Sequence, residues 1–281
     1  MSHCAYYSEK FWIQDLYWLL YSPPLHKNTP LNIFSISQWE QWNSLLCQYY
    51  SPQQIQDLDN YFIHHHSHFL LGKYTENLFL WWLKQPFTHE VYGWKLYQHE
   101  AVPQNHNIVI YQTINGKKGD EKITIGELDF LISVDNSVIY HLELAVKFYL
   151  YIPQLHEAYG LGLNDTWSRK NQQIEKTFLL GKEYLATFNR FKDSQSFESL
   201  PWIKGVIHYP KQQITNKLNN IHHEHQKGCY EISNITTEEI QRQHANMDHA
   251  NNHLSPRLLT RAHLNLEVNQ SWLDLALTEY D

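Results

Sequence analysis

The sequence predicts an α/β fold in which helices flank a central mixed sheet. Residues 1–70 carry apolar side chains at helical spacing, residues 94–150 contain several strand-like segments, and residues 165–186 and 205–209 fit one more helix and one more strand. This order of elements is typical of a sheet whose faces are covered by helices. We expect a helical subdomain in residues 1–70 and an α/β core with a C-terminal elaboration in residues 71–281, packed as one compact unit.

Three helices are expected in the N-terminal part. The first follows the apolar spacing of residues 11–20 and ends before Pro23. Ser37 and Glu40 have the spacing of a capping box and predict the start of the second helix. Pro52 fits the first position of the third. The aromatic residues along these helices are interpreted as core.

Two further helices are expected in the core. The first covers residues 74–83 and carries Glu76. The second begins after Asn164 or Asp165, either of which is a good N-cap residue, and reaches residue 186.

Apolar runs and turn residues predict the strands of the sheet. Asn115 and Gly116 form a dipeptide that favours a tight hairpin turn. The expected strands cover residues 94–99, 108–114, 122–133, 138–150 and 205–209.

Composition and charge restrict the class of protein. The chain has 281 residues, a net charge of −7 and three cysteines. Three scattered cysteines do not make a disulfide framework, no leader-like segment opens the chain, and no apolar run reaches membrane-spanning length. We therefore expect a cytoplasmic protein without a membrane partner. The negative charge argues against a protein that coats nucleic acid, but a nuclease needs only a local groove of cations.

Histidines are frequent in the chain and gather around residues 64–68 and 222–225. A zinc site requires ligands fixed in tetrahedral geometry, and adjacent residues of one helix point in different directions. No cysteine or second histidine pair follows at finger-like spacing. We interpret these histidines as polar surface groups.

The most informative segment is residues 126–147. Because side chains alternate between the faces of a strand, Glu127 and Asp129 share a face of one expected strand, and Glu143 and Lys147 share a face of the next. Paired across a hairpin, Asp129 and Glu143 can bind a hard cation through oxygen, while Lys147 orients a water molecule. This is the layout of a metal-dependent phosphodiesterase site.

The same pattern also has a purely structural interpretation. Antiparallel strands often carry alternating charges on a solvated face. A glutamate opposite a lysine is an ordinary cross-strand pair. The residues alone leave both interpretations open.

Residues 124–131 and 141–150 resemble the signature of a bacterial family known as domain of unknown function 1853. This family is grouped with the PD-(D/E)xK, restriction-endonuclease-like superfamily. Residues 15–25, 71–78 and 204–210 are similar to further parts of the family in the expected order. The resemblance therefore covers most of the chain.

The resemblance implies a restriction-endonuclease-like core and a nuclease that uses Mg²⁺ or Mn²⁺. In such a site Asp129 and Glu143 ligate the ion, and the backbone carbonyl of Val146 completes the protein ligands. Lys147 positions the attacking water, and Glu76 assists from the preceding helix.

One position departs from the superfamily pattern. The second carboxylate usually lies two residues before the lysine, and here that position is Ala145. Glu143 lies two residues further back on the same strand face, about 6.5 to 7 Å away, and is interpreted as a displaced ligand. An alternative therefore stays open, in which the chain is a non-catalytic descendant that binds nucleic acid or a protein partner.

A nuclease also needs cations that contact the phosphate backbone. Arg169 and Lys170 on the expected helix, and Arg257 and Arg261 near the C-terminus, are the candidates for this groove. Each also fits an ordinary solvated surface position. Nucleic acid, DNA before RNA, is the expected partner.

Overall fold

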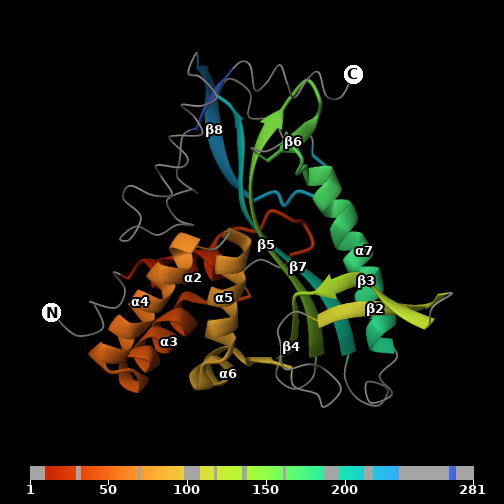
Figure 1. Ribbon diagram of the computed structural model, residues 1–281. Coiled ribbons are helices and arrows are strands. Elements are labelled where there is room, and N and C mark those ends of the chain that lie inside the picture. Colours follow the sequence, from red (N-terminus) through yellow and green to blue (C-terminus); the bar gives the residue numbers. More distant parts are fainter. Residues whose placement is uncertain are drawn as a thin grey trace.

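The computed structural model describes ten segments of the chain, and they build a mixed sheet with helices on both of its faces (Figure 1). The described residues are 10–29, 33–68, 71–97, 108–116, 119–134, 138–160, 163–186, 196–211, 218–233 and 266–269. The expected α/β architecture with a central mixed sheet is confirmed.

Five helices form the N-terminal layer (Figure 1). They are α2 (Phe11–Tyr21), α3 (Ile36–Tyr49), α4 (Pro52–His68), α5 (Leu71–Leu83) and α6 (Pro86–Tyr92).

The capping residues of α3 and α4 satisfy backbone groups that have no partner inside the helix. The capping box of α3 is formed by Ser35 and Gln38, not by the predicted Ser37 and Glu40. The expected start of α4 is confirmed, because Ser51 and Gln54 make reciprocal hydrogen bonds just around Pro52. The serine that acts as N-cap in α3 therefore lies two residues earlier than expected.

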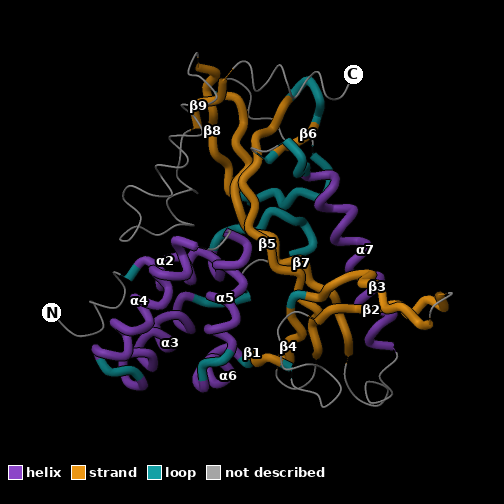
Figure 2. The backbone as a smooth tube through the Cα atoms, viewed as in Figure 1, coloured by secondary structure: helices purple, strands orange, loops and turns teal. Residues whose placement is uncertain are grey.

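The main sheet has the strand order β1-β4-β5-β7-β8-β9, with β6 paired to β5 (Figure 2). Strands β1, β4 and β5 pair antiparallel, whereas β5, β7, β8 and β9 pair parallel. The strands are β1 (Trp94–Leu96), β4 (Phe130–Val134), β5 (Val138–Ile152), β6 (Glu157–Tyr159), β7 (Ser196–Pro210), β8 (Gln226–Ser233) and β9 (Leu266–Asn269).

A separate two-stranded hairpin, β2 (Ile108–Gly116) with β3 (Gly119–Leu128), projects beside the sheet (Figure 1). Asn115 pairs with Asp120 and Gly116 with Gly119, so the predicted turn at Asn115 and Gly116 is instead the last paired part of the hairpin. The predicted strand over residues 122–133 is divided at Asp129 between β3 and β4.

The two faces of β5 are covered by different helices (Figure 1). Leu142, Leu144 and Val146 pack into one large cluster together with α2 and α5. The opposite face of β5 lies against α7 (Trp167–Ala186), where Tyr149 and Trp167 belong to a second cluster. The predicted alternation along β5 is confirmed, and it places Glu143 and Lys147 on the α7 side.

The N-terminal helices share their core with the sheet and do not form a separate one. Trp12 and Leu16 of α2 belong to the same buried cluster as Leu144 of β5. Lys204 of β7 is buried and donates a hydrogen bond to the carbonyl oxygen of Leu20 at 3.4 Å, near the end of α2. Burial lowers the pKa of Lys204 to about 7. This lysine ties the end of α2 to the centre of the sheet.

Several elements were not expected from the sequence. Strand β7 starts at Ser196, well before the predicted strand over residues 205–209. The short elements α6 and β6 carry little periodicity, and no strand was predicted over the residues of β8.

Candidate metal centre

Asp129 lies where β4 separates from β5. Strand β4 pairs with β5 only up to Leu142, and β6 pairs with it only from Leu150 onward, so none of the described strands pairs with residues 143–149 on that edge. The Asp129 carboxylate accepts a hydrogen bond from the backbone N–H of Leu144 at 2.9 Å. An acidic side chain is thereby fixed at an unpaired edge in the middle of the sheet.

The carboxylate of Asp129 is electrostatically unfavourable in its charged form. Desolvation, followed by the negative charges of Glu143 and Glu76, raises the pKa of Asp129 well above its ordinary value. The Leu144 N–H and the Lys170 ammonium act in the opposite direction but do not cancel these effects. Three acidic residues from a strand junction, a strand and a helix therefore influence one position.

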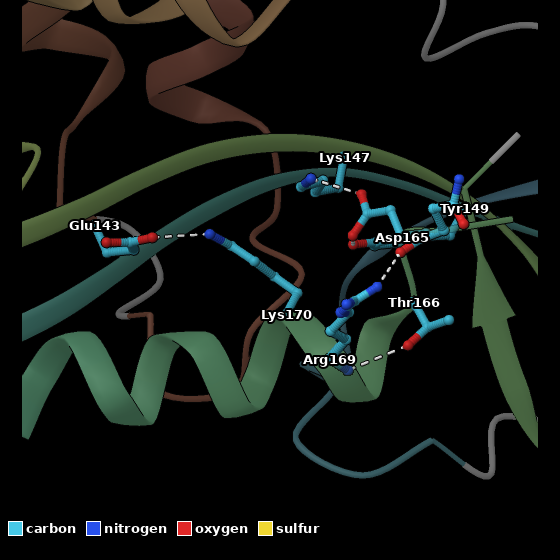
Figure 3. A network of polar contacts seen from close by, with 8 residues as sticks. Glu143, Lys147, Tyr149, Asp165, Thr166, Arg169 and Lys170 are labelled. Carbon is cyan, nitrogen blue, oxygen red and sulfur yellow. Dashed lines mark hydrogen bonds and ion pairs between the residues drawn. The ribbon is translucent and has the colours of Figure 1, made fainter. Parts of the chain in front are cut away.

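Glu143 forms a buried ion pair with Lys170 (Figure 3). The Nζ atom of Lys170 lies 2.8 Å from Oε1 of Glu143, and each side chain is only 6 % exposed. Lys170 comes from the first turn of α7, which covers this face of β5. The glutamate is thus neutralised by a lysine of the protein itself.

Lys147 has a different partner from Glu143, although both side chains lie on the same face of β5 (Figure 3). Its Nζ atom lies 2.6 Å from Oδ2 of Asp165, which directly precedes Thr166 and α7. The hydroxyl of Tyr149 donates to the other oxygen of Asp165 at 3.2 Å. This second ion pair is partly exposed and forms the outer part of the site.

The backbone of β5 also directs a carbonyl to the edge at which Asp129 is bound. A β-carbon at Gly205 of β7 would lie 1.7 Å from the carbonyl oxygen of Lys147, so that carbonyl points toward β7. Carbonyls of consecutive strand residues point to opposite edges. The Val146 carbonyl therefore faces the same edge of β5 as the Leu144 N–H that bonds to Asp129.

Glu76 lies on α5 and forms an ion pair with Lys73 at 3.0 Å. Its negative charge acts on Asp129 from the face of the sheet opposite to α7. In the part of the chain that the structure describes, no three histidine, cysteine or acidic side chains lie close enough together to hold a metal ion. A cation at Asp129 would therefore be held by few protein ligands and complete its shell with water or substrate oxygens. Mg²⁺ commonly binds in this way, through one or two carboxylates.

Only some of the cations expected in a nucleic-acid groove lie among the described residues, and they differ in exposure. Arg169 is exposed and donates to the backbone carbonyl of Asn164 at 2.8 Å (Figure 3). Lys170 does not have the expected surface position, because its side chain is buried against Glu143. Arg257 and Arg261 lie outside the described residues.

The interpretation of the histidines as surface groups is wrong for two of them. His222 and His225 are buried. The ring of His225 bonds to the hydroxyl of Tyr209 at 3.0 Å and to the carbonyl oxygen of His222 at 2.7 Å. Burial lowers the pKa of His225 to about 4. The side chains of the histidines around residues 64–68 lie outside the described residues.

Sequence reasoning missed Asp165 as the partner of Lys147 and Lys170 as the partner of Glu143. It assigned Asp165 to the helix cap, but the Thr166 hydroxyl accepts the N–H of Arg169 at 3.2 Å and takes that role. The sequence contains a pattern that indicates the position of Lys170. With Thr166 as the N-cap, the helix period places Lys170, Ile174 and Thr177 on one face, and this face is buried against the sheet.

Comparison with known proteins gives the family of the chain. A family model described as "Domain of unknown function (DUF1853)" matches residues 14–257, and the chain belongs to this family. No curated protein and no solved structure matches the chain. Among the described helices, none has the length and apolar character needed to cross a membrane.

Proposed function

We propose that this member of the DUF1853 family is a metal-dependent nuclease that hydrolyses nucleic-acid phosphodiester bonds on a restriction-endonuclease-like core. The observation that carries the proposal is the concentration of carboxylates around Asp129 at the unpaired edge of β5. A bound divalent cation would relieve the repulsion among these carboxylates, which otherwise opposes ionisation of Asp129.

In this proposal Mg²⁺ or Mn²⁺ is held by Asp129 and the Val146 carbonyl, and Glu143 is a neighbouring carboxylate whose charge acts on Asp129. When bound, such an ion lowers the pKa of water and offsets the charge of the transition-state phosphate. The mixed sheet, the helices on both of its faces and the acidic helix residue Glu76 agree with the proposed core.

The more exposed residues of the site are assigned the remaining roles in catalysis and substrate binding. Lys147 is partly exposed, and its pairing with Asp165 holds the ammonium in the more exposed part of the site. It can orient the attacking water or approach the scissile phosphate there. Arg169 is exposed on the same side of α7 as Asp165 and supplies a phosphate contact (Figure 3).

A second candidate function is favoured by one specific observation. The ion pair between Glu143 and Lys170 supplies a cation within the protein, and Ala145 leaves the usual second carboxylate position without an acid. Both features fit a nuclease fold that has lost catalysis and binds nucleic acid or a protein partner.

A cleavage assay separates the two functions. Labelled single-stranded, duplex and branched DNA and RNA are incubated with the protein in Mn²⁺, Mg²⁺ or EDTA. We expect metal-dependent cleavage of at least one substrate, and its loss in Asp129→Asn, which removes the charged ligand but keeps the side-chain shape. Glu127→Gln is the matched control, because Glu127 is exposed on β3 two residues away. Equal cleavage by wild type and Asp129→Asn would exclude the assigned site.

A further inference from the structure

We infer that Lys170 is the resident cation of the carboxylate site and that it withholds Glu143 from the metal, so that one divalent ion binds through Asp129 and the Val146 carbonyl. This inference rests on the proposed function, which supplies the divalent ion. It assigns Lys170 a positioning role that differs from the surface phosphate contact expected from the sequence.

The geometry of the ion pair between Lys170 and Glu143 supports the positioning role of Lys170. The 2.8 Å contact joins two side chains that are each 6 % exposed, so little water is available to replace either partner. Inside a protein the attraction between opposite charges is stronger than in water, and a carboxylate without its partner is costly to bury. The ion pair between Glu143 and Lys170 is therefore favoured, and Glu143 contributes little to the binding of a neighbouring ion.

Lys170 is also held by a rigid element. Its backbone N–H donates to the Thr166 carbonyl at 2.9 Å, and the buried residues Trp167 and Ile174 fix α7 against the sheet. A cation in the first turn of a helix faces the positive end of the helix dipole, which disfavours it. The pairing with Glu143 offsets this unfavourable position.

The two lysines near the site are therefore not equivalent. Lys147 pairs with Asp165 at a site where the two side chains are 28 % and 42 % exposed, so solvent and substrate can reach it. Lys170 is enclosed and contacts the inner glutamate. We assign the substrate-facing role to Lys147 and the fixed internal charge to Lys170.

Calorimetric titration with Mn²⁺ tests the inference on the full chain after EDTA treatment. In Lys170→Met the Glu143 carboxylate is released and becomes available to the ion. We expect Mn²⁺ to bind about tenfold more tightly than in wild type, since partners of ligand groups change metal affinity by about 10- to 100-fold. Adding Glu143→Gln to this variant should remove the gain. Lys170→Arg keeps the charge and should bind Mn²⁺ like the wild type.

A second comparison of variants tests the inference even if Lys170→Met does not fold. In the otherwise unchanged chain, Glu143→Gln should weaken Mn²⁺ binding far less than Asp129→Asn, because Glu143 is already occupied. Equal losses in these two variants would overturn the inference, as would a folded Lys170→Met variant with unchanged affinity.

The result for the wild type separates this inference from the proposed function. If wild type binds no Mn²⁺, the proposed metal enzyme fails. A gain of Mn²⁺ binding in Lys170→Met would then still support the assignment of Lys170, and no binding in either protein would overturn it.

Discussion

Lys147 and Asp165 form an ion pair of 2.6 Å that joins β5 to the residue before the α7 cap, while Lys170 and Glu143 form a second pair deeper in the same interface. The sequence predicted Lys147 as the lysine that accompanies Asp129 and Glu143 in the site. The structure instead gives the inner position to Lys170. The two pairs differ mainly in their exposure to solvent.

We expect the loss of each lysine to affect stability differently. Lys147→Met should lower the free energy of unfolding by less than about 1 kcal/mol, because partly exposed ion pairs contribute little. Lys170→Met should lower it by about 3 kcal/mol or more, because Glu143 is left buried without a counter-ion. Urea unfolding in EDTA measures both. Asp165→Asn, the control on the other side of the outer pair, should match Lys147→Met. Equal losses for the two lysines would contradict the assignment of inner and outer pairs.

The local features of the fold could be predicted from the sequence, and the pairing between distant segments could not. Periodicity along β5 placed Glu143 and Lys147 on one face, and Pro23 and Pro52 marked helix boundaries correctly. Spacing alone does not say which lysine reaches which carboxylate, since Glu143 and Lys170 are brought together only by packing of α7 on the sheet. The same limitation explains the buried position of His225, whose partner Tyr209 lies 16 residues earlier in the chain, on β7.

Gly205 is required by the close approach of β7 to β5. Its φ of 144° is a conformation that L residues rarely adopt, and a β-carbon there would lie 1.7 Å from the carbonyl oxygen of Lys147. We expect Gly205→Ala to lower the free energy of unfolding by about 3 kcal/mol or more, because backbone strain and displacement of β5 act together. Thermal unfolding checks this.

Gly72→Ala is the control for this substitution. Gly72 lies in α5, and a β-carbon there would meet nothing within 4 Å. The change should raise stability by about 0.5 kcal/mol, since alanine favours helix more than glycine does. A destabilised Gly72→Ala variant, or a Gly205→Ala variant as stable as wild type, would contradict this account of β7.

Buried histidines predict that the protein loses stability in mild acid. The pKa of His225 is lowered to about 4, first by desolvation, from an ordinary value near 6.5. Above pH 6.5 this histidine is neutral in both the folded and the unfolded state. As the pH falls from 6.5 to 4, the unfolded state binds the proton first, so stability decreases, by up to about 3 kcal/mol for this group.

Urea unfolding between pH 7 and pH 4 measures this dependence. His225→Gln should be less stable than wild type at pH 7, because the bonds to Tyr209 and His222 are altered, but it should lose less stability on acidification. His223→Gln is the matched control, since the side chain of His223 is exposed, and it should keep the dependence of the wild type. An unchanged pH dependence in His225→Gln would show that other groups cause the acid sensitivity.

Ala145→Glu tests whether the chain needs the second carboxylate that the PD-(D/E)xK pattern usually has. Ala145 lies between Glu143 and Lys147 on the α7 side of β5 and is only partly buried. A glutamate there costs about 1 to 3 kcal/mol for partial burial of a polar group. It also adds an acidic ligand beside the Val146 carbonyl, so we expect tighter Mn²⁺ binding and faster cleavage. Ala145→Gln has the same size without the charge and should show the stability loss alone.

The outcome of the cleavage assay then decides between the two proposed functions. Activity in the wild type that increases in Ala145→Glu supports a nuclease that works without the usual second carboxylate. An inert wild type and an active Ala145→Glu variant identify a degenerate nuclease, whose present role is binding. If both proteins are inert although Ala145→Glu binds Mn²⁺ tightly, the ion does not reach a position suited to hydrolysis. In that case the ion pair between Lys147 and Asp165 is the next contact to remove, because it sets where the outer lysine lies.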